Sequence, residues 1–392
     1  GVQTCALPIS PKGQLEVTVC YGGVRLSTDY LGVEGAEVSM TWKLQSRALT
    51  EMGFHDDCFW TPEHPNLFDV VFTLRADGQR EDRVQSYFAL RKVGVEGGRF
   101  QLNNLSYYQK LLLDQGYWPD SLLTPPSDEA IRYDIEMSKA MGFNGCRKHQ
   151  KVEDPRFLYW ADKLGFLVWG EMANAYLYSV RYVARFTREW MEVVERDYNH
   201  PCIVAWTPLN ESWGVEDIAY RKDQQAHAAA LYYLIKSLDQ TRPVVSNDGW
   251  QHAQTDLLTI HDYESNGDVL RQRYGALDTI LACQPANRSL FAQGWSYEGQ
   301  PILTSEVGGI SYRKGSQEGW GYSTASDDAD YARRYHAVIS ALLASPHIQG
   351  FVYTQTTDVE QEINGVMTYD RKPKLDPAVF KAINEGVWRP EE

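Results

Sequence analysis

Polar side chains that could perform acid–base chemistry follow several short apolar segments of this 392-residue sequence. They are Arg147 and His149 after FNGC, Glu171 after FLVW, Asn210 and Glu211 after CIVAWTPL, His261 and Tyr263 after LLTI, and Glu306 after PILTS. Glu211 and Glu306 form the kind of carboxyl pair that hydrolyses a glycosidic bond. One carboxylic acid protonates the leaving oxygen, and the other carboxylate attacks the anomeric carbon to give a covalent glycosyl-enzyme. A carboxylate is costly to bury without a partner, so a glutamate directly after an apolar segment needs a reason to be there.

The apolar segments themselves are predicted strands of a parallel sheet. Eight of them follow one another from about Asn103 onward, namely YYQKLLL, FNGC, FLVW, CIVAW, PVVS, LLTIH, PILTS and IQGFVYT. Amphipathic helices are predicted between them; before FNGC, for example, Ser127 can cap a helix that Gly142 ends. Alternating strands and helices indicate α/β architecture, and eight such units predict a (β/α)8 TIM barrel. The reactive groups of a TIM barrel lie at the carboxyl ends of its strands.

The region before the barrel has a different pattern. QLEVTVCY, EVSMTWKLQ and DVVFTLRA alternate polar and apolar residues and predict an antiparallel sheet with one solvated face. We therefore expect a β-sandwich domain, whole or incomplete, over residues 11–95 and the TIM-barrel catalytic domain over residues 96–392. Residues 1–10, GVQTCALPIS, resemble the translation of a common sequencing adapter, and the chain does not begin with Met. We expect this first segment to be non-native and the N-terminus to be truncated.

Composition and charge exclude several classes of partner. The net charge of -14 and the pI near 5.2 argue against nucleic acid and against an anionic membrane surface. A neutral carbohydrate substrate fits this charge. The six cysteines show no CxxC spacing, so we predict no metal site and no cofactor. The compartment stays open between periplasmic, secreted and cytoplasmic, and a homo-oligomer of the longer parent protein is an expectation.

Four motifs resemble those of glycoside hydrolase family 2, the β-galactosidase and β-glucuronidase family. HPCIVAWTPLNESWG (200–214) resembles the family's strand-four signature, and TSEVGG (304–309) resembles its strand-seven nucleophile motif. AMGFNGCRKH and ADKLGFLVWGEM resemble its strand-two and strand-three blocks. WTPEHPNLFDVVFTL with DRVQSYFALRKV resembles the end of its immunoglobulin-like sandwich. The resemblance covers roughly residues 15 to 375 and implies that the predicted sandwich is immunoglobulin-like.

The resemblance also implies roles for the residues at the strand ends. Glu211 would be the general acid/base and Glu306 the nucleophile. Asn210 would hydrogen-bond the sugar 2-hydroxyl, an interaction that strengthens in the transition state. Arg147 would hold the nucleophile ionised, because a nearby cation lowers a carboxyl pKa.

The resemblance leaves alternative roles open for four further residues. Tyr263 or His261 would hydrogen-bond the nucleophile, with Tyr263 preferred. His149 would contact a sugar hydroxyl or be a satisfied structural histidine. Glu171 would contact the sugar or pair with a neighbouring cation.

Three tryptophans in loops after strands are predicted sugar platforms: Trp213, Trp295 and Trp320. Sugars present apolar C–H faces that stack on flat aromatic rings. The other aromatic residues are expected mostly in the core.

The sequence therefore predicts a retaining β-glycosidase, with β-galactosides as the first choice of substrate. The alternatives are a β-glucuronidase or β-mannosidase of the same family, or a catalytically inactive carbohydrate-binding barrel. Members of this family carry an N-terminal sugar-binding β-domain before the sandwich, and we expect the truncation of the N-terminus to have removed it. An unrelated barrel enzyme and a doubly wound nucleotide-binding sheet find no support, because the sequence has no HExxH, GxSxG, P-loop or GxGxxG pattern.

Overall fold

The computed structural model describes residues 13–35, 37–41, 58–76, 81–315 and 318–389. The chain forms two compact units, one of residues 1–91 with 199–201 and the other of residues 92–198 with 202–392. Each unit has its own sheet and its own hydrophobic core. No helix among these residues is long and apolar enough to cross a membrane.

The first unit contains a four-stranded antiparallel sheet in the order β2-β1-β3-β4. Its strands are β1 (Gly13–Tyr21), β2 (Val24–Val33), β3 (Phe68–Ala76) and β4 (Asp82–Phe88). β1 and β2 form a hairpin around Gly22 and Gly23, whose φ angles of 56° and 79° are those that two-residue hairpin loops require. The core of this sheet is built from Val17, Val19, Cys58, Phe68 and Val70.

Two of the three strands predicted for this region form. QLEVTVCY lies in β1 and DVVFTLRA lies in β3, whereas β2 was not predicted. The predicted strand EVSMTWKLQ does not form over its first five residues, Glu37–Thr41, which have no regular structure. Its remaining residues, 42–45, lie outside the described part of the chain. The Gly22–Gly23 pair was the overlooked indication of β2, because such pairs mark tight hairpins.

The second unit contains a parallel sheet of seven strands in the order β11-β10-β9-β8-β16-β13-β12. The strands are β8 (Gln109–Asp114), β9 (Gly145–Lys148), β10 (Leu167–Glu171), β11 (Ile203–Thr207), β12 (Leu258–Asp262), β13 (Ile302–Gly308) and β16 (Ile348–Thr354). Every residue of β9, β11, β12 and β13 is buried. Such fully buried strands explain why the sequence shows continuous apolar runs here instead of alternation.

The eighth predicted strand, PVVS, is not a strand of this sheet. The segment 243–248 instead makes two isolated parallel bridges at the side of β11, Trp206 with Val244 and Asn210 with Asp248. On its other side, the backbone groups of this segment are satisfied partly by side chains. Oγ1 of Thr255 donates to the carbonyl of Val244 at 3.3 Å, and the N–H of Gly249, the residue after the segment, donates to Oγ1 of Thr259 at 3.1 Å. A continuous ladder to β12 therefore does not form.

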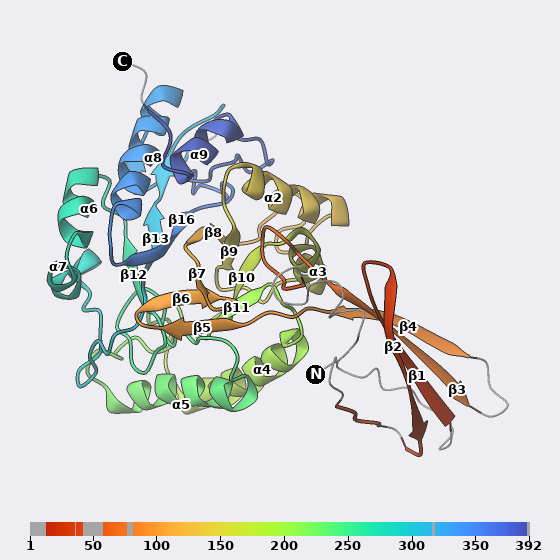
Figure 1. Ribbon diagram of the computed structural model, residues 1–392. Coiled ribbons are helices and arrows are strands. Elements are labelled where there is room, and N and C mark those ends of the chain that lie inside the picture. Colours follow the sequence, from red (N-terminus) through yellow and green to blue (C-terminus); the bar gives the residue numbers. More distant parts are fainter. Residues whose placement is uncertain (1–12, 36, 42–57, 77–80, 316–317, 390–392) are drawn as a thin grey trace. The chain divides into compact units, whose positions relative to one another are not determined.

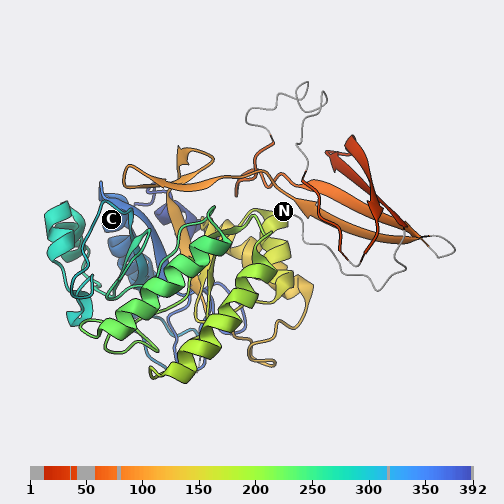
Figure 2. The same ribbon diagram turned by 90° about the horizontal axis from the view of Figure 1, so that it is seen from below.

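Helices cover the outside of the parallel sheet (Figure 1). They are α2 (Asp128–Ala140), α3 (Pro155–Leu164), α4 (Val180–Asp197), α5 (Lys222–Leu238), α6 (Gly267–Tyr274), α7 (Leu277–Ala282), α8 (Asp328–Leu343), α9 (Pro377–Asn384) and the short 3-10 helix η1 (Pro285–Asn287). Ser127, Asp154 and Ser179 cap the starts of α2, α3 and α4 with side-chain oxygens. α4 and α5 lie side by side in both views (Figures 1 and 2).

Two small sheets complete the second unit. One is antiparallel and consists of β5 (Val93–Glu96), β6 (Arg99–Leu102) and β7 (Leu105–Ser106). The other pairs β14 (Ile310–Ser311) with β15 (Ser323–Thr324) in the loop that follows β13. This loop carries Trp320 and Tyr322 and is therefore placed by β13, the strand that bears Glu306.

Candidate active site

The predicted site residues lie at or just beyond the carboxyl ends of the parallel strands. Arg147 is in β9, Glu171 ends β10, and Glu306 is in β13. His261 is in β12, with Tyr263 one residue beyond its end. Asn210, Glu211 and His149 follow β11 and β9. Because parallel strands end at the same edge of a sheet, these side chains converge.

Arg147 is the buried centre of the site. All five N–H groups of its guanidinium have acceptors: Nε and Nη2 donate to Glu171 at 2.7 and 3.2 Å, and Nη2 also donates to Oδ1 of Asn210 at 2.6 Å. Nη1 donates to the carbonyl of Ser305 at 3.1 Å and to Oε1 of Glu306 at 2.9 Å. A guanidinium has five donors, so none is left for a substrate. In this arrangement Arg147 orients the side chains around it.

Glu306 is enclosed by hydrogen-bond donors. Arg147 donates to one carboxylate oxygen, and the hydroxyl of Tyr263 donates to the other. Nε2 of His261 lies 3.5 Å from Oε1 of Glu306, a longer contact than that of Tyr263. Burial raises the pKa of Glu306 above its ordinary value, and the positive charges of His261 and Arg147 act in the opposite direction. Burial thus outweighs the effect that we expected from Arg147.

Glu211 has a more open environment than Glu306. Its side chain is 22% exposed, compared with 6% for Glu306. Its Oε1 lies 2.8 Å from Nδ1 of His261. The backbone of Glu211 and Ser212 has φ angles of 50° and 60°, in the left-handed region that non-glycine residues rarely adopt. Strained backbone of this kind concentrates at functional sites.

Asn210 leaves one polar group unused. Its Oδ1 accepts from Arg147, which fixes the orientation of the amide. Its Nδ2 is buried and has no hydrogen-bond partner among the described residues. An unsatisfied buried amide donor is costly, so this group is poised to bind an acceptor on a ligand.

His149 and Glu171 both contact the guanidinium of Arg147. His149 keeps 20% of its side chain exposed, and its Nδ1 lies 3.7 Å from Oε1 of Glu306. Burial, then the charge of Arg147, lowers the pKa of His149 well below its usual value, which keeps the imidazole neutral. Glu171 is fully buried and accepts from Arg147 and from the backbone N–H of Gln150 at 2.8 Å. Of the two roles predicted for Glu171, the structure shows the pairing with a neighbouring cation, Arg147.

The three predicted tryptophan platforms differ in position. Trp320 packs edge-on against Tyr322 at 5.7 Å, and Tyr322 stacks on Tyr263 with ring centroids 3.4 Å apart. Trp213, two residues after Glu211, is 37% exposed and contacts Tyr176 edge-on. Trp295 lies in the loop before β13.

Sequence reasoning missed Asp248. Its Oδ2 lies 2.8 Å from Nη1 of Arg147 and 2.8 Å from Nε2 of His261, and its side chain is fully buried. Burial raises its pKa, but Arg147 and His261 outweigh burial and hold the pKa of this carboxyl well below its ordinary value. Asp248 follows the PVVS segment, so applying the strand-end rule to that segment as well would have found it.

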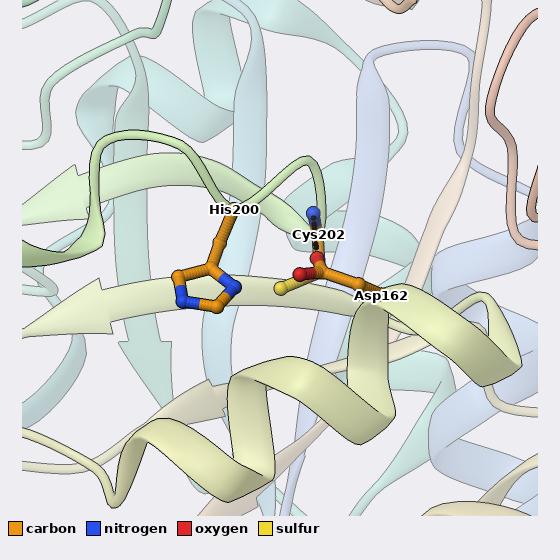
Figure 3. Close-up of side chains that lie close together, drawn as sticks. All are labelled: Asp162, His200 and Cys202. Atoms are coloured by element: carbon orange, nitrogen blue, oxygen red, sulfur yellow. Dashed lines mark hydrogen bonds between the residues drawn. The ribbon is translucent and has the colours of Figure 1, made fainter. Parts of the chain in front are cut away.

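Among the described residues, two groups of side chains combine residue types that can ligate metals. In the first, Glu211, His261 and Glu306 have donor atoms within 4.8 Å of one another. The second is Asp162, His200 and Cys202, shown in Figure 3. In that group the carboxylate of Asp162 accepts the backbone N–H of Cys202 at 2.9 Å, at the start of β11 and thus at the far end of that strand from Asn210. We assign no metal to either group.

Comparisons with known proteins agree on one family. Residues 127–309 match the model of the glycosyl hydrolases family 2 TIM barrel domain, and residues 21–91 match a second model of glycosyl hydrolases family 2. The β-galactosidase of Leuconostoc mesenteroides is 26% identical over 242 residues, which are 56% of this chain and 20% of that protein. The β-galactosidase of Photobacterium profundum is 27% identical over 230 residues, 52% of this chain and 21% of that protein. The matched region thus spans about a fifth of these curated relatives.

Solved structures share the fold. A family 2 β-galacturonidase from Eisenbergiella tayi superposes with a TM-score of 0.72 at 21% identity, covering 98% of this chain and 68% of that one. A β-glucuronidase from Bacteroides uniformis superposes with a TM-score of 0.72 at 20% identity, covering 98% and 47%. At this identity the likeness concerns the fold. The two family models, over residues 21–91 and 127–309, establish that the chain belongs to glycosyl hydrolase family 2.

Proposed function

We propose that this protein is a retaining β-glycosidase in which Glu306 is the nucleophile and Glu211 is the general acid/base. The observation that carries the proposal is the spacing of the two carboxylates: an oxygen of Glu211 lies within 4.8 Å of an oxygen of Glu306. Retaining enzymes hold their carboxyl groups roughly 5–5.5 Å apart, whereas inverting enzymes need roughly 6.5–9.5 Å to admit a water.

The assignment of roles follows from the surroundings of each glutamate. Glu306 receives hydrogen bonds from Arg147 and Tyr263, which hold its oxygens in place for attack on the anomeric carbon. Glu211 is more exposed and contacts an imidazole. Such surroundings suit a group that must give a proton to the leaving oxygen and then take one from water. The unpartnered Nδ2 of Asn210 would bind the sugar 2-hydroxyl beside these groups.

We propose a neutral β-galactoside as the first substrate to test. The chain carries a net charge of -14, and the buried guanidinium of Arg147 has no donor left for a substrate carboxylate. The matched curated relatives are β-galactosidases. A β-glucuronidase, a β-mannosidase or an inactive carbohydrate-binding barrel are the other outcomes of a panel of aryl β-glycosides.

The proposal extends to the architecture. The segment 243–248 occupies the position of the eighth strand beside β11 and would complete a (β/α)8 barrel with the seven paired strands. Residues 11–95, most of which the second family model matches, would form the immunoglobulin-like sandwich that the motifs WTPEHPNLFDVVFTL and DRVQSYFALRKV imply.

Azide rescue separates the two catalytic roles. Glu306→Ala should abolish turnover of every substrate, because the nucleophile acts in both steps. Glu211→Ala should fail on alkyl glycosides but still react with a dinitrophenyl glycoside, whose leaving group needs no proton. Added azide should then produce a β-glycosyl azide from Glu211→Ala. Azide that replaces a missing nucleophile attacks the anomeric carbon directly and inverts it, so a β-azide from Glu306→Ala together with an α-azide from Glu211→Ala would reverse the roles. Full activity in both variants would refute the site.

A further inference from the structure

His261 connects the Glu211 carboxyl to a third, fully buried carboxylate. Its Nδ1 lies 2.8 Å from Oε1 of Glu211, and its Nε2 lies 2.8 Å from Oδ2 of Asp248. The ring is 4% exposed and packs directly against the backbone of Gly249. A Cβ at position 249 would lie 2.2 Å from Cδ2 of His261, so the Asp248–Gly249 pair fixes both the direction and the depth of the imidazole.

The two hydrogen bonds of the His261 ring determine how many protons His261 and Glu211 hold between them. Asp248 is ionised, because Arg147 and His261 hold the pKa of its carboxyl well below the ordinary value despite its burial. Its carboxylate can only accept, so Nε2 of His261 carries a hydrogen. The contact between Nδ1 and Glu211 also needs one hydrogen, which resides either on the imidazole or on the carboxyl. Glu211 and His261 together therefore hold one exchangeable proton.

We propose that this shared proton is the one that acid/base catalysis uses, and that Asp248 is the positioning residue that keeps His261 able to hold it. The inference rests on the proposed function, because it concerns the proton that Glu211 delivers. It assigns to His261 the holding of this proton and to Asp248 the positioning of His261, neither of which is part of the proposed roles of Glu211 and Glu306.

The proton balances over both steps of the reaction. In the first step, a Glu306 oxygen bonds to the anomeric carbon as the bond from that carbon to the leaving oxygen breaks. The leaving oxygen takes the shared proton through Glu211, which leaves a carboxylate facing the lone pair of a neutral His261. In the second step, a water gives one proton to the Glu211–His261 pair while its oxygen replaces Glu306 at the anomeric carbon. The pair is then restored.

The charged groups around His261 determine whether its pKa is raised or lowered. Glu306 at 3.5 Å, Asp248 and Glu211 are its anionic neighbours, and Arg147 at 3.4 Å is its cationic neighbour. Burial lowers the pKa of His261, but the three carboxylates outweigh burial and raise the pKa to about 10. Removing the charge of Asp248 takes away one of these carboxylates and leaves Arg147 in place, so the pKa of His261 must fall.

The test is the pH profile of kcat/KM for Asp248→Asn, measured in the full chain with an alkyl β-glycoside and a dinitrophenyl β-glycoside. With the alkyl substrate, the alkaline limb should move to lower pH by roughly 1–3 units, the effect of one nearby charge. With the dinitrophenyl substrate the limb should not move, because that leaving group needs no proton. His261→Gln should produce the same downward shift and serves as the second variant if Asp248→Asn does not fold.

Asp239→Asn is the matched control. Asp239 is also a buried aspartate whose carboxylate pairs with an arginine, Arg242, at 2.6 Å, but it follows α5, away from the carboxyl ends of the strands. Its substitution should lower stability and leave the alkaline limb in place. If the limb moves equally in Asp239→Asn, or stays in place in both Asp248→Asn and His261→Gln, the shared proton is refuted.

A titration of the histidine ring by NMR makes the result independent of turnover. His261 should stay a doubly protonated imidazolium above pH 8 and titrate at lower pH in Asp248→Asn. This result in a protein that hydrolyses no glycoside would count against the proposed function and not against the pairing. An active protein whose His261 is neutral at pH 7 would overturn the inference while leaving the glycosidase intact.

Discussion

At the scale of single residues, the site depends on one buried guanidinium. Arg147 is surrounded by the carboxylates of Glu171, Asp248 and Glu306, none of which is exposed by more than 6%. Removing one partner from a buried ionic network leaves uncompensated charge, which costs far more than losing an exposed pair.

Arg147→Met should therefore destabilise the second unit by roughly 3–5 kcal/mol. Arg156, whose side chain is 45% exposed and pairs with Asp128 and Asp154, is the matched control. Arg156→Met should leave the unfolding midpoint in urea close to that of the wild type. Equal midpoints for the two variants would show that the buried network does not support the fold.

Residue types and strand ends were enough to select most of the side chains that converge here, including Glu211, Glu306 and Arg147. Asp248 was not predicted because SNDGW has the composition of a turn, and turn residues usually have a structural role in the loop. Whether His261 or Tyr263 contacts Glu306 also could not be settled from sequence. That choice depends on a difference of one or two residues in register, and the structure gives Tyr263 the shorter contact.

At the scale of elements, seven of the eight predicted strands of the parallel sheet form. Continuous apolar runs identified them because their side chains are buried on both faces. PVVS has the same composition, yet it pairs only through isolated bridges. The composition of a segment does not predict whether the backbone N–H and C=O groups beside it are free to form a ladder. Here the side chains of Thr255 and Thr259 form hydrogen bonds with some of these backbone groups.

The end of this segment should be intolerant of a side chain. Gly249 has a φ of +81°, and a Cβ there would meet the ring of His261 at 2.2 Å. Gly299 has a φ of +95° but open space around it, so it shares the backbone penalty without the collision. Gly249→Ala should lose at least about 1 kcal/mol more stability than Gly299→Ala and most of its activity. Equal effects, measured by urea unfolding and kcat, would mean that the loop moves aside.

At the scale of the whole molecule, the family and the order of its parts could be read from the sequence, because motifs and strand spacing are local properties. The incomplete pairing of the eighth strand could not be read, because it depends on neighbours distant in the chain. The hairpin strand β2 had a local indication in the Gly22–Gly23 pair, which was overlooked.

Buried histidines should limit stability in mild acid. Burial lowers the pKa of His252 to about 4, so this imidazole is neutral in the folded protein. The unfolded chain binds a proton as the pH falls through roughly 6.5, and the folded chain does not until about pH 4. Stability should therefore be full above pH 6.5 and fall below it, by up to about 2 kcal/mol at pH 5 from this residue. Urea unfolding of His252→Gln should show a shallower slope in this range; an unchanged slope would assign the acid sensitivity elsewhere.

The central claim is that Glu306 forms a covalent bond to the sugar and Glu211 does not. Trapping with an activated 2-deoxy-2-fluoro-β-galactoside, followed by peptide mass spectrometry, tests it directly, because the fluorine slows breakdown of the glycosyl-enzyme. The label should appear on the peptide that contains Glu306, in the wild type and in Glu211→Ala, and should be absent from Glu306→Ala. A label on the Glu211 peptide, or turnover that yields the α-anomer first with no labelled peptide, would contradict the account.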